Sequence, residues 1–164
     1  MGDAASLIEK YRGKGVFVDT NLLVLLLVGL VNPKRICNFK RTENFEIADF
    51  YRLQRLIDWF GPPIAATPHV LSQVSDLAKL SGPEFHKARE LFKQLVTDID
   101  ECTFAAKELV HHELFHQFGL ADASVATACE QHRLVLTADV LLYSSLTSRG
   151  PDAVNFNHVR ALAW

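Results

Sequence analysis

The sequence has few cysteines and lacks the spacing of a cysteine zinc site. Its 164 residues include three cysteines, Cys37, Cys102 and Cys129, which lie far apart and form no C-x-x-C motif. An odd number of scattered cysteines argues against a disulfide framework and is typical of a chain kept in a reducing compartment. We therefore expect a cytoplasmic protein whose thiols are free.

The sequence also lacks a long hydrophobic run. Its most apolar stretch, Leu22 to Val31, has ten residues, is preceded by Asp19 and ends at Asn32-Pro33. A membrane-spanning helix needs about 20 apolar residues, and this run begins too far along the chain, behind an acid, to be a signal peptide. We expect no membrane span, and a buried helix packed on a sheet.

No excess of basic charge marks the chain as a whole as a partner of nucleic acid. The formal net charge is −2, so any site for a polyanion must be local. The connector 33–42 contains no acid and, beside Phe39, four basic residues that are candidates for contact with RNA phosphates: Lys34, Arg35, Lys40 and Arg41. The alternative is a solvated loop.

The residues that are present indicate a single α/β domain over 1–164. Hydrophobic residues make up 49% of the chain and charged residues 22%, which is enough apolar surface for one core. Short β-branched runs alternate with helical patterns, and this alternation predicts a three-layer α/β/α fold with a central, mostly parallel sheet. The expected strands are 15–18, 64–66, 102–104, 133–137 and 154–159. The expected helices are 1–14, 22–31, 43–60, one from Thr67, one to about 96, one from Ala105, one from Asp122 and 140–148.

The stretch HHELFHQFGLAD contains an H-E-x-x-H pattern. On one helix, His112 and His116 would share a face and could bind one zinc ion, with Glu113 as the base and Asp122 as a third ligand. Zinc proteases with this pattern need a methionine turn downstream, and the one methionine here is Met1. The sequence therefore gives the zinc protease little weight.

Three acids, Asp122 among them, follow the expected strands or open a helix. Asp19 follows GVFV, Asp139 follows LVLT after one residue, and Asp122 opens an Ala-rich helix. The carboxyl ends of parallel strands share one edge of a sheet, where ligands bind. Three carboxylates gathered there repel each other, and Mg²⁺ or Mn²⁺ is the natural compensating ion. Such ions support phosphodiester cleavage.

Each of these acids also has a simpler interpretation. Asp19 could be a helix cap, with Thr20 or Asn21 as competing caps, and Asp122 could be the N-cap of its helix. Asp139 could be an ordinary turn residue. The order and context of all three acids favour the functional interpretation.

Four short motifs in order resemble the PIN domain, a family of metal-dependent ribonucleases common among bacterial toxin-like proteins. The resemblance covers nearly the whole chain, through VFVDTN, TPHVLSQVSDLA, GLADAS and LTAD. It implies an acidic pocket that binds Mg²⁺ or Mn²⁺ and cleaves single-stranded RNA. On this resemblance, Asp19, Asp122 and Asp139 are the metal ligands and catalytic acids, and Asn21 and Thr137 support them by hydrogen bonding.

The sequence departs from the family pattern at Gln73, where the family usually has a Glu. Glutamine keeps one acceptor oxygen and removes a charge, which lowers the expected metal affinity. Asp76, three residues further on, could partly compensate. The chain is then a natural weak or inactive protein, an enzyme that works with three acids, or a chain whose native Glu was replaced.

The leading hypothesis is therefore a toxin-like endoribonuclease acting on single-stranded or structured RNA, with an antitoxin protein and a homodimer as candidate partners. A catalytically inactive RNA-binding or scaffold protein of the same fold is the alternative. The zinc protease that uses His112, Glu113 and His116 comes third.

Overall fold

A computed structural model describes residues 4–131 and 133–162 of the chain. It contains one five-stranded sheet in the order β3-β2-β1-β4-β5, in which every neighbouring pair is parallel. The predicted α/β class with a parallel sheet is confirmed. The strands are β1 (Val16–Val18), β2 (Ile64–Ala66), β3 (Asp100–Glu101), β4 (Val135–Thr137) and β5 (Ala153–Asn155).

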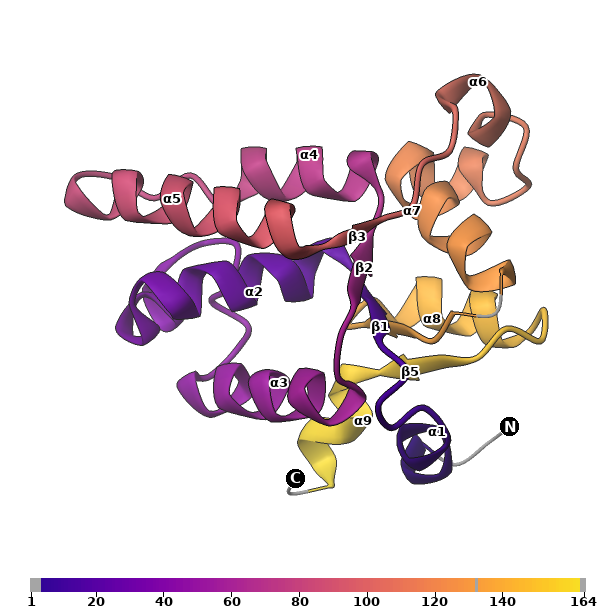
Figure 1. The fold of residues 1–164 in the computed structure, drawn as a ribbon, viewed down its shortest axis with the longest axis horizontal. Coiled ribbons are helices and arrows are strands. Elements are labelled where there is room, and N and C mark those ends of the chain that lie inside the picture. Colours follow the sequence, from indigo (N-terminus) through magenta and orange to yellow (C-terminus); the bar gives the residue numbers. More distant parts are fainter. Residues whose placement is uncertain (1–3, 132, 163–164) are drawn as a thin grey trace.

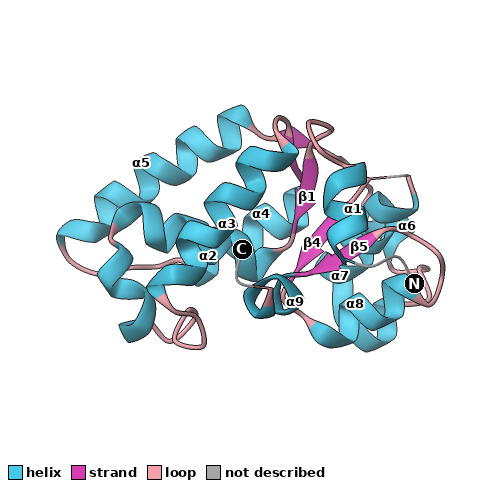
Figure 2. Cartoon of the chain, turned by 90° about the horizontal axis from the view of Figure 1, so that it is seen from below, coloured by secondary structure: helices cyan, strands magenta, loops and turns pink. Residues whose placement is uncertain are grey.

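The helices cover both faces of the sheet and form three layers (Figure 1; Figure 2). Helices α2 to α5 lie on one side, and α1, α6, α7 and α8 lie on the other. The helices are α1 (Ala4–Lys10), α2 (Thr20–Val31), α3 (Ile47–Phe60), α4 (Pro68–Leu77), α5 (Pro83–Asp98), α6 (Ala106–Leu109), α7 (Phe115–Glu130), α8 (Val140–Thr147) and α9 (Phe156–Ala161). A 3-10 helix, η1 (Pro33–Asn38), follows α2.

The strand order creates a switch point between β1 and β4. The chain runs from β1 outward to β2 and β3, then returns to β4 on the other side of β1 and continues to β5. Loops that leave β1 and β4 therefore turn to opposite faces of the sheet, and the carboxyl ends of two such strands are the usual ligand site of these sheets. Asp19 and Asp139 follow these two strands.

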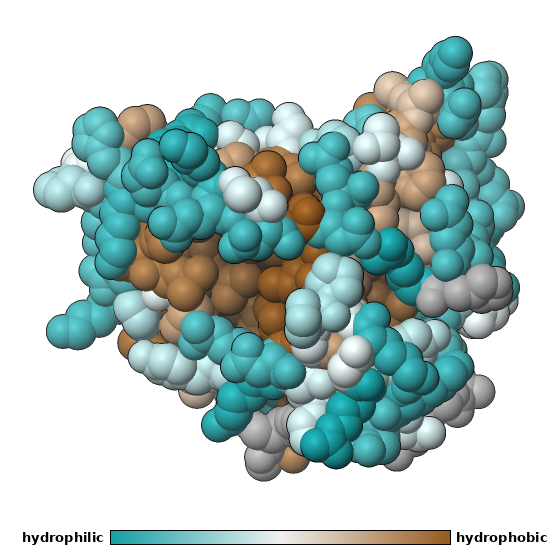
Figure 3. Space-filling view, in the orientation of Figure 1, coloured by the Kyte–Doolittle hydropathy of each residue, from teal (hydrophilic) through white to brown (hydrophobic). Residues whose placement is uncertain are grey.

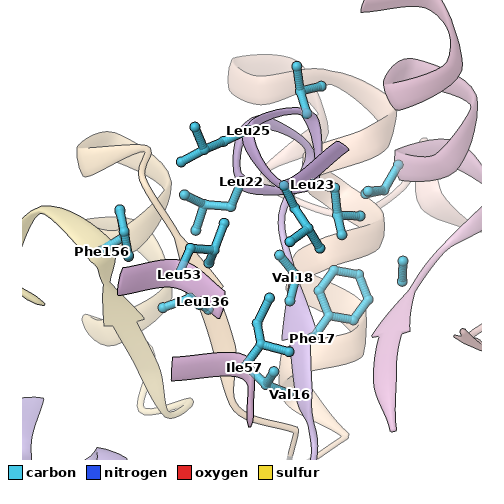
Figure 4. Packing of buried hydrophobic residues seen from close by; sticks show 14 of the residues in the cluster. Val16, Phe17, Val18, Leu22, Leu23, Leu25, Leu53, Ile57, Leu136 and Phe156 are labelled. Atoms are coloured by element: carbon cyan, nitrogen blue, oxygen red, sulfur yellow. The ribbon is translucent and has the colours of Figure 1, made fainter. Parts of the chain in front are cut away.

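Helix α2 lies at the centre of the core, as its Leu-rich sequence predicts. Leu22, Leu23 and Leu25 are fully buried and belong to the same hydrophobic core as Phe17 and Val18 of β1 (Figure 4). A helix that is apolar on all sides needs neighbours on all sides, and α3, α4 and α5 supply them. No described helix is long and apolar enough to cross a membrane.

Several predicted element boundaries were wrong. The expected strand 154–159 is a strand only to Asn155, and α9 begins at Phe156 because the Asn155 side chain accepts a hydrogen bond from Asn157 N and caps it. The expected strand at 102–104 lies two residues earlier, as β3. The helix expected from residue 43 begins at Ile47, because Glu46 and Asp49 form a capping box there.

The expected helix break at Gly119 is confirmed within α7. Gly119 has a φ of +85° and a ψ of −173°, which interrupts the helical backbone four residues after α7 begins. Left-handed φ values favour glycine because it has no Cβ. Asp122 therefore lies in the first turn after this break, in the longer part of α7, and is not the residue that caps the helix.

Candidate metal centre at the carboxyl edge of the sheet

Asp19 is held by the backbone at the point where β1 ends and α2 begins. Its side chain caps α2, and its Oδ1 accepts a hydrogen bond of 2.6 Å from Thr20 N. The sequence left three candidates for this cap, Asp19, Thr20 and Asn21, and Asp19 takes the position. Asp19 is 3% exposed, and burial raises the pKa of its carboxyl group above the ordinary value, although hydrogen bonds from Thr137 and Thr20 oppose the rise.

Thr137 connects the acids of β1 and β4. Its hydroxyl donates a hydrogen bond of 2.7 Å to Asp19 Oδ2 and accepts one of 3.0 Å from Asp139 N. Thr137 is fully buried at the last position of β4. This is the supporting role by hydrogen bonding that the sequence predicts for Thr137.

Asp139 caps α8 with one oxygen and leaves the other free. Its Oδ1 accepts hydrogen bonds of 2.8 Å from Leu141 N and 2.9 Å from Leu142 N. Within residues 4–131 and 133–162, Oδ2 receives no hydrogen bond. Asp139 is thus the N-cap of α8 and not an ordinary turn residue, and its second oxygen is available to a ligand.

Asp122 is the third acid, and its environment is also unfavourable for a negative charge. Burial, followed by repulsion from Asp19 and Asp139, raises the pKa of Asp122 to about 7. No described residue donates a hydrogen bond to its carboxylate. The structure thus brings the three predicted acids close enough for their charges to interact.

Helix α7 is fixed in this position by a buried hydroxyl pair. Thr67 Oγ1, which caps α4, lies 2.7 Å from Ser124 Oγ of α7. Both side chains are fully buried. This contact joins the segment that carries Asp122 to the helix that carries Gln73.

Gln73 lies beside the acids through a contact that the sequence did not suggest. Thr20 Oγ1 donates a hydrogen bond of 2.9 Å to Gln73 Oε1. The amide nitrogen of Gln73 has no partner in the described part of the chain, so an exposed neutral donor remains next to Asp19. The sequence feature that could have indicated this contact is the hydroxyl group of Thr20, directly after Asp19, which the sequence offered as a helix cap.

The donor chemistry of this edge suits a hard cation. The free oxygens belong to carboxylates, and magnesium is commonly bound by one or two carboxylates together with water and phosphate oxygens. In the described residues, no three His, Cys, Asp or Glu side chains are placed to hold one metal ion. An ion bound at this edge would therefore be held by at most two of Asp19, Asp122 and Asp139.

The remaining predicted residues lie outside this centre. Asn21 is exposed, and its side chain has no hydrogen-bond partner among the described residues. Asp76 is exposed and pairs with Lys79 at 3.1 Å, so it does not take the place of a Glu at position 73. Neither residue raises the pKa of Asp122.

The basic connector begins at the far end of α2 from Asp19. Helix α2 has 12 residues, which separates its two ends by roughly 18 Å. Arg35 pairs with Glu84 at 3.0 Å. Three exposed cations have no ion pair among the described residues: Lys34, Lys40 and Arg41.

The H-E-x-x-H pattern does not form one continuous helical face. His112 lies in the turn before α7, where its Nδ1 accepts a hydrogen bond from Leu114 N and its Nε2 lies 3.3 Å from Glu130. Glu113 forms an ion pair with Arg149. Both ring nitrogens of His112 are thus engaged, and His116 is on a different element from His112.

No protein-family model, curated protein or solved structure matches this chain. The resemblance to the PIN domain therefore depends on the four sequence motifs, and the interpretation of the site depends on its geometry.

Proposed function

We propose that this protein is a metal-dependent endoribonuclease. The observation that carries the proposal is the meeting of Asp19, Asp122 and Asp139 at the switch point of the sheet, where burial and mutual repulsion raise the pKa of Asp122 to about 7. A stable fold gains nothing from three buried or half-buried acids without a compensating cation. Perturbed acids in a crevice are typical of functional sites.

A bound Mg²⁺ or Mn²⁺ ion would activate water and stabilise the charge that develops on the phosphate oxygens. The free oxygens of Asp122 and Asp139 would hold it, and Asp19 would complete the negative field. Thr137 keeps Asp19 and Asp139 in a fixed relation, because one hydroxyl contacts both residues. The free amide of Gln73 would donate a hydrogen bond to a phosphate oxygen beside the ion.

The substrate in this proposal is single-stranded or structured RNA. The exposed cations Lys34, Lys40 and Arg41 offer contacts to the phosphates of a strand that extends beyond the three acids. Three further points stay predictions that rest on the resemblance and on the composition: regulation by an antitoxin, formation of a homodimer, and a cytoplasmic location.

An RNA-binding protein without activity is the second candidate, and Gln73 is the observation that favours it. On the resemblance, a neutral amide replaces a charge at a residue that contacts Thr20, directly after Asp19, and this replacement lowers the attraction for a cation. The two candidate functions predict different results when Gln73→Glu restores the charge: the enzyme should gain cleavage activity, and the inactive RNA-binding protein should not.

The test is cleavage of a labelled single-stranded RNA with Mg²⁺, with Mn²⁺ and with a chelator. We expect metal-dependent cleavage that falls at least 100-fold in Asp122→Asn, a typical loss when a group that stabilises the transition state is removed. Asp76→Asn is the matched control, because it removes the same charge from an exposed position and should leave the rate unchanged.

The variant Gln73→Glu decides between the two candidates. If the pocket is otherwise intact, the added carboxylate should raise the Mn²⁺-dependent rate and tighten Mn²⁺ binding measured by calorimetry. RNA binding without cleavage in either form would favour the inactive protein. Stoichiometric zinc that is lost in His112→Ala would instead support the protease and contradict the proposal.

A further inference from the structure

An apolar cavity of about 370 Å³, lined by none of the three acids, lies between the carboxyl ends of α3 and α5 and the start of β2. Its walls are aliphatic: Ile57, Pro62, Pro63, Ile64, Leu95 and Ile99. The volume is within the range of about 300–1,000 Å³ that is common for sites of small organic ligands. In Figure 3, hydrophobic residues are visible between the hydrophilic borders formed by α3 and α5.

Two acids stand at the border of this cavity. Asp58 lies in the last turn of α3, and Asp98 is the last residue of α5. Both are exposed, and neither has an ion pair or a side-chain hydrogen bond within the described ranges. None of the residues that line the cavity is basic.

The helix ends add to the negative potential of the two acids. The carboxyl end of a helix carries a partial negative charge, and an acid placed there is unfavourable while a cation is favourable. Neither α3 nor α5 has a basic residue in its last turn. Two helix ends and two unpaired carboxylates therefore face one apolar cavity, and none of the described residues that line it carries a positive charge.

This combination selects a particular class of ligand. A metal ion prefers several oxygen ligands, and the aliphatic walls offer it none. An anion is repelled by Asp58 and Asp98. A molecule with an aliphatic stem and an ammonium group at each end satisfies both features, because its methylene groups cover the apolar walls while its charges stay at the solvent-exposed border.

We propose that this cavity is a binding site for an aliphatic diamine cation, separate from the three acids at the sheet edge. Asp58 binds one ammonium group and Asp98 binds the other. The stem lies along Ile57, Ile64 and Leu95. The site is independent of any activity at the sheet edge, because its residues lie on α3, β2 and α5 and include none of the three acids there.

The test is calorimetric titration of the full chain at low salt with cadaverine, n-pentylamine and pentanediol. We expect saturable binding in the order cadaverine, pentylamine, pentanediol, because each exposed ion pair contributes about 2- to 5-fold in affinity. Putrescine, one methylene shorter, should bind about fourfold more weakly, from about 0.8 kcal/mol for each buried methylene.

Single variants test whether the heat measured in the cadaverine titration comes from binding in this cavity. Asp58→Asn and Asp98→Asn should each weaken cadaverine binding about 2- to 5-fold, while Asp122→Asn should leave it unchanged. Equal affinity for cadaverine and pentylamine would overturn the proposal, as would unchanged binding in both cavity variants. Loss of binding in Asp122→Asn would place the amine at the sheet edge and also contradict the proposal.

Discussion

At the scale of single residues, the negative charge of Asp122 is unfavourable in the folded state. Its carboxylate is partly buried, has no hydrogen-bond donor among the described residues and lies in the field of two other acids. The folded state therefore holds a proton on Asp122 at pH values where the unfolded chain has released it. The free energy of unfolding should therefore depend on pH, because the folded and unfolded states bind different numbers of protons.

We predict that the free energy of unfolding falls as pH rises from about 4 to about 7, because the pKa of Asp122 is raised in the folded state from 3.8 to about 7. The limit is about 1.4 kcal/mol for each pH unit, and the partial exposure of the side chain reduces it. Asp122→Asn should remove this contribution and be more stable than the original chain at about pH 8. Urea unfolding at several pH values measures both effects.

The control for this experiment is Asp76→Asn, which changes an exposed acid of the same type. Its pH profile should follow that of the original chain. The prediction is contradicted if the free energy of unfolding of Asp122→Asn changes with pH as steeply as that of the original chain. Asp122 would then not have the raised pKa on which the proposed centre depends.

At the scale of elements, the packing of α2 against α3 depends on the absence of one side chain. A Cβ at Gly29 would lie 2.2 Å from the Phe50 ring, well inside any allowed contact. Gly29 therefore lets the two helices approach each other closely, although glycine inside a helix costs about 1 kcal/mol relative to alanine.

We predict that Gly29→Ala destabilises the protein by about 1–3 kcal/mol, because the cost of overpacking exceeds the gain in helix propensity. The measurement is the urea midpoint at constant m-value. Combining Gly29→Ala with Phe50→Leu should recover part of the loss, since the ring that the methyl group meets is then absent. A more stable single variant would show that α3 can move aside at little cost.

At the scale of the whole molecule, Asp49 joins α3 to the C-terminal helix α9. Its carboxylate is 1% exposed and binds Arg52 of α3 and Arg160 of α9, each at 3.0 Å. It also accepts a hydrogen bond of 2.9 Å from Glu46 N at the start of α3. One buried acid therefore fixes the start of α3 and the position of α9.

We predict that Asp49→Ala destabilises the fold by about 3 kcal/mol, because it leaves two arginines without their partner. Asp49→Asn is the matched variant, since it keeps an acceptor for Glu46 N and removes the charge. It should cost less than Asp49→Ala, and thermal unfolding of both forms measures the difference. Equal losses would assign the whole effect to the ion pairs and none to the helix cap.

The sequence by itself determined the class of this fold and the order of its acids. The β-branched runs before Asp19 and Asp139 marked buried parallel strands, and the Leu-rich run marked a central helix, because these patterns depend on the burial of each element alone. The break at Gly119 was also visible, since glycine is the residue that best adopts its backbone conformation. The local pattern gave the wrong prediction for α9, because a short apolar segment fits a strand as well as a buried helix. The cap at Asn155 distinguishes the two, and it is evident only in the structure.

The tertiary structure alone decided which residues meet. Strand order follows from the direction of each crossover, which no local pattern records, and it made β1 and β4 neighbours. That arrangement brought Asp19 to Thr137, raised the pKa of Asp122 and gave Gln73 its contact with Thr20. It also separated His112 from His116 and placed the ends of α3 and α5 around one cavity, because proximity in space depends on packing rather than on spacing in the chain.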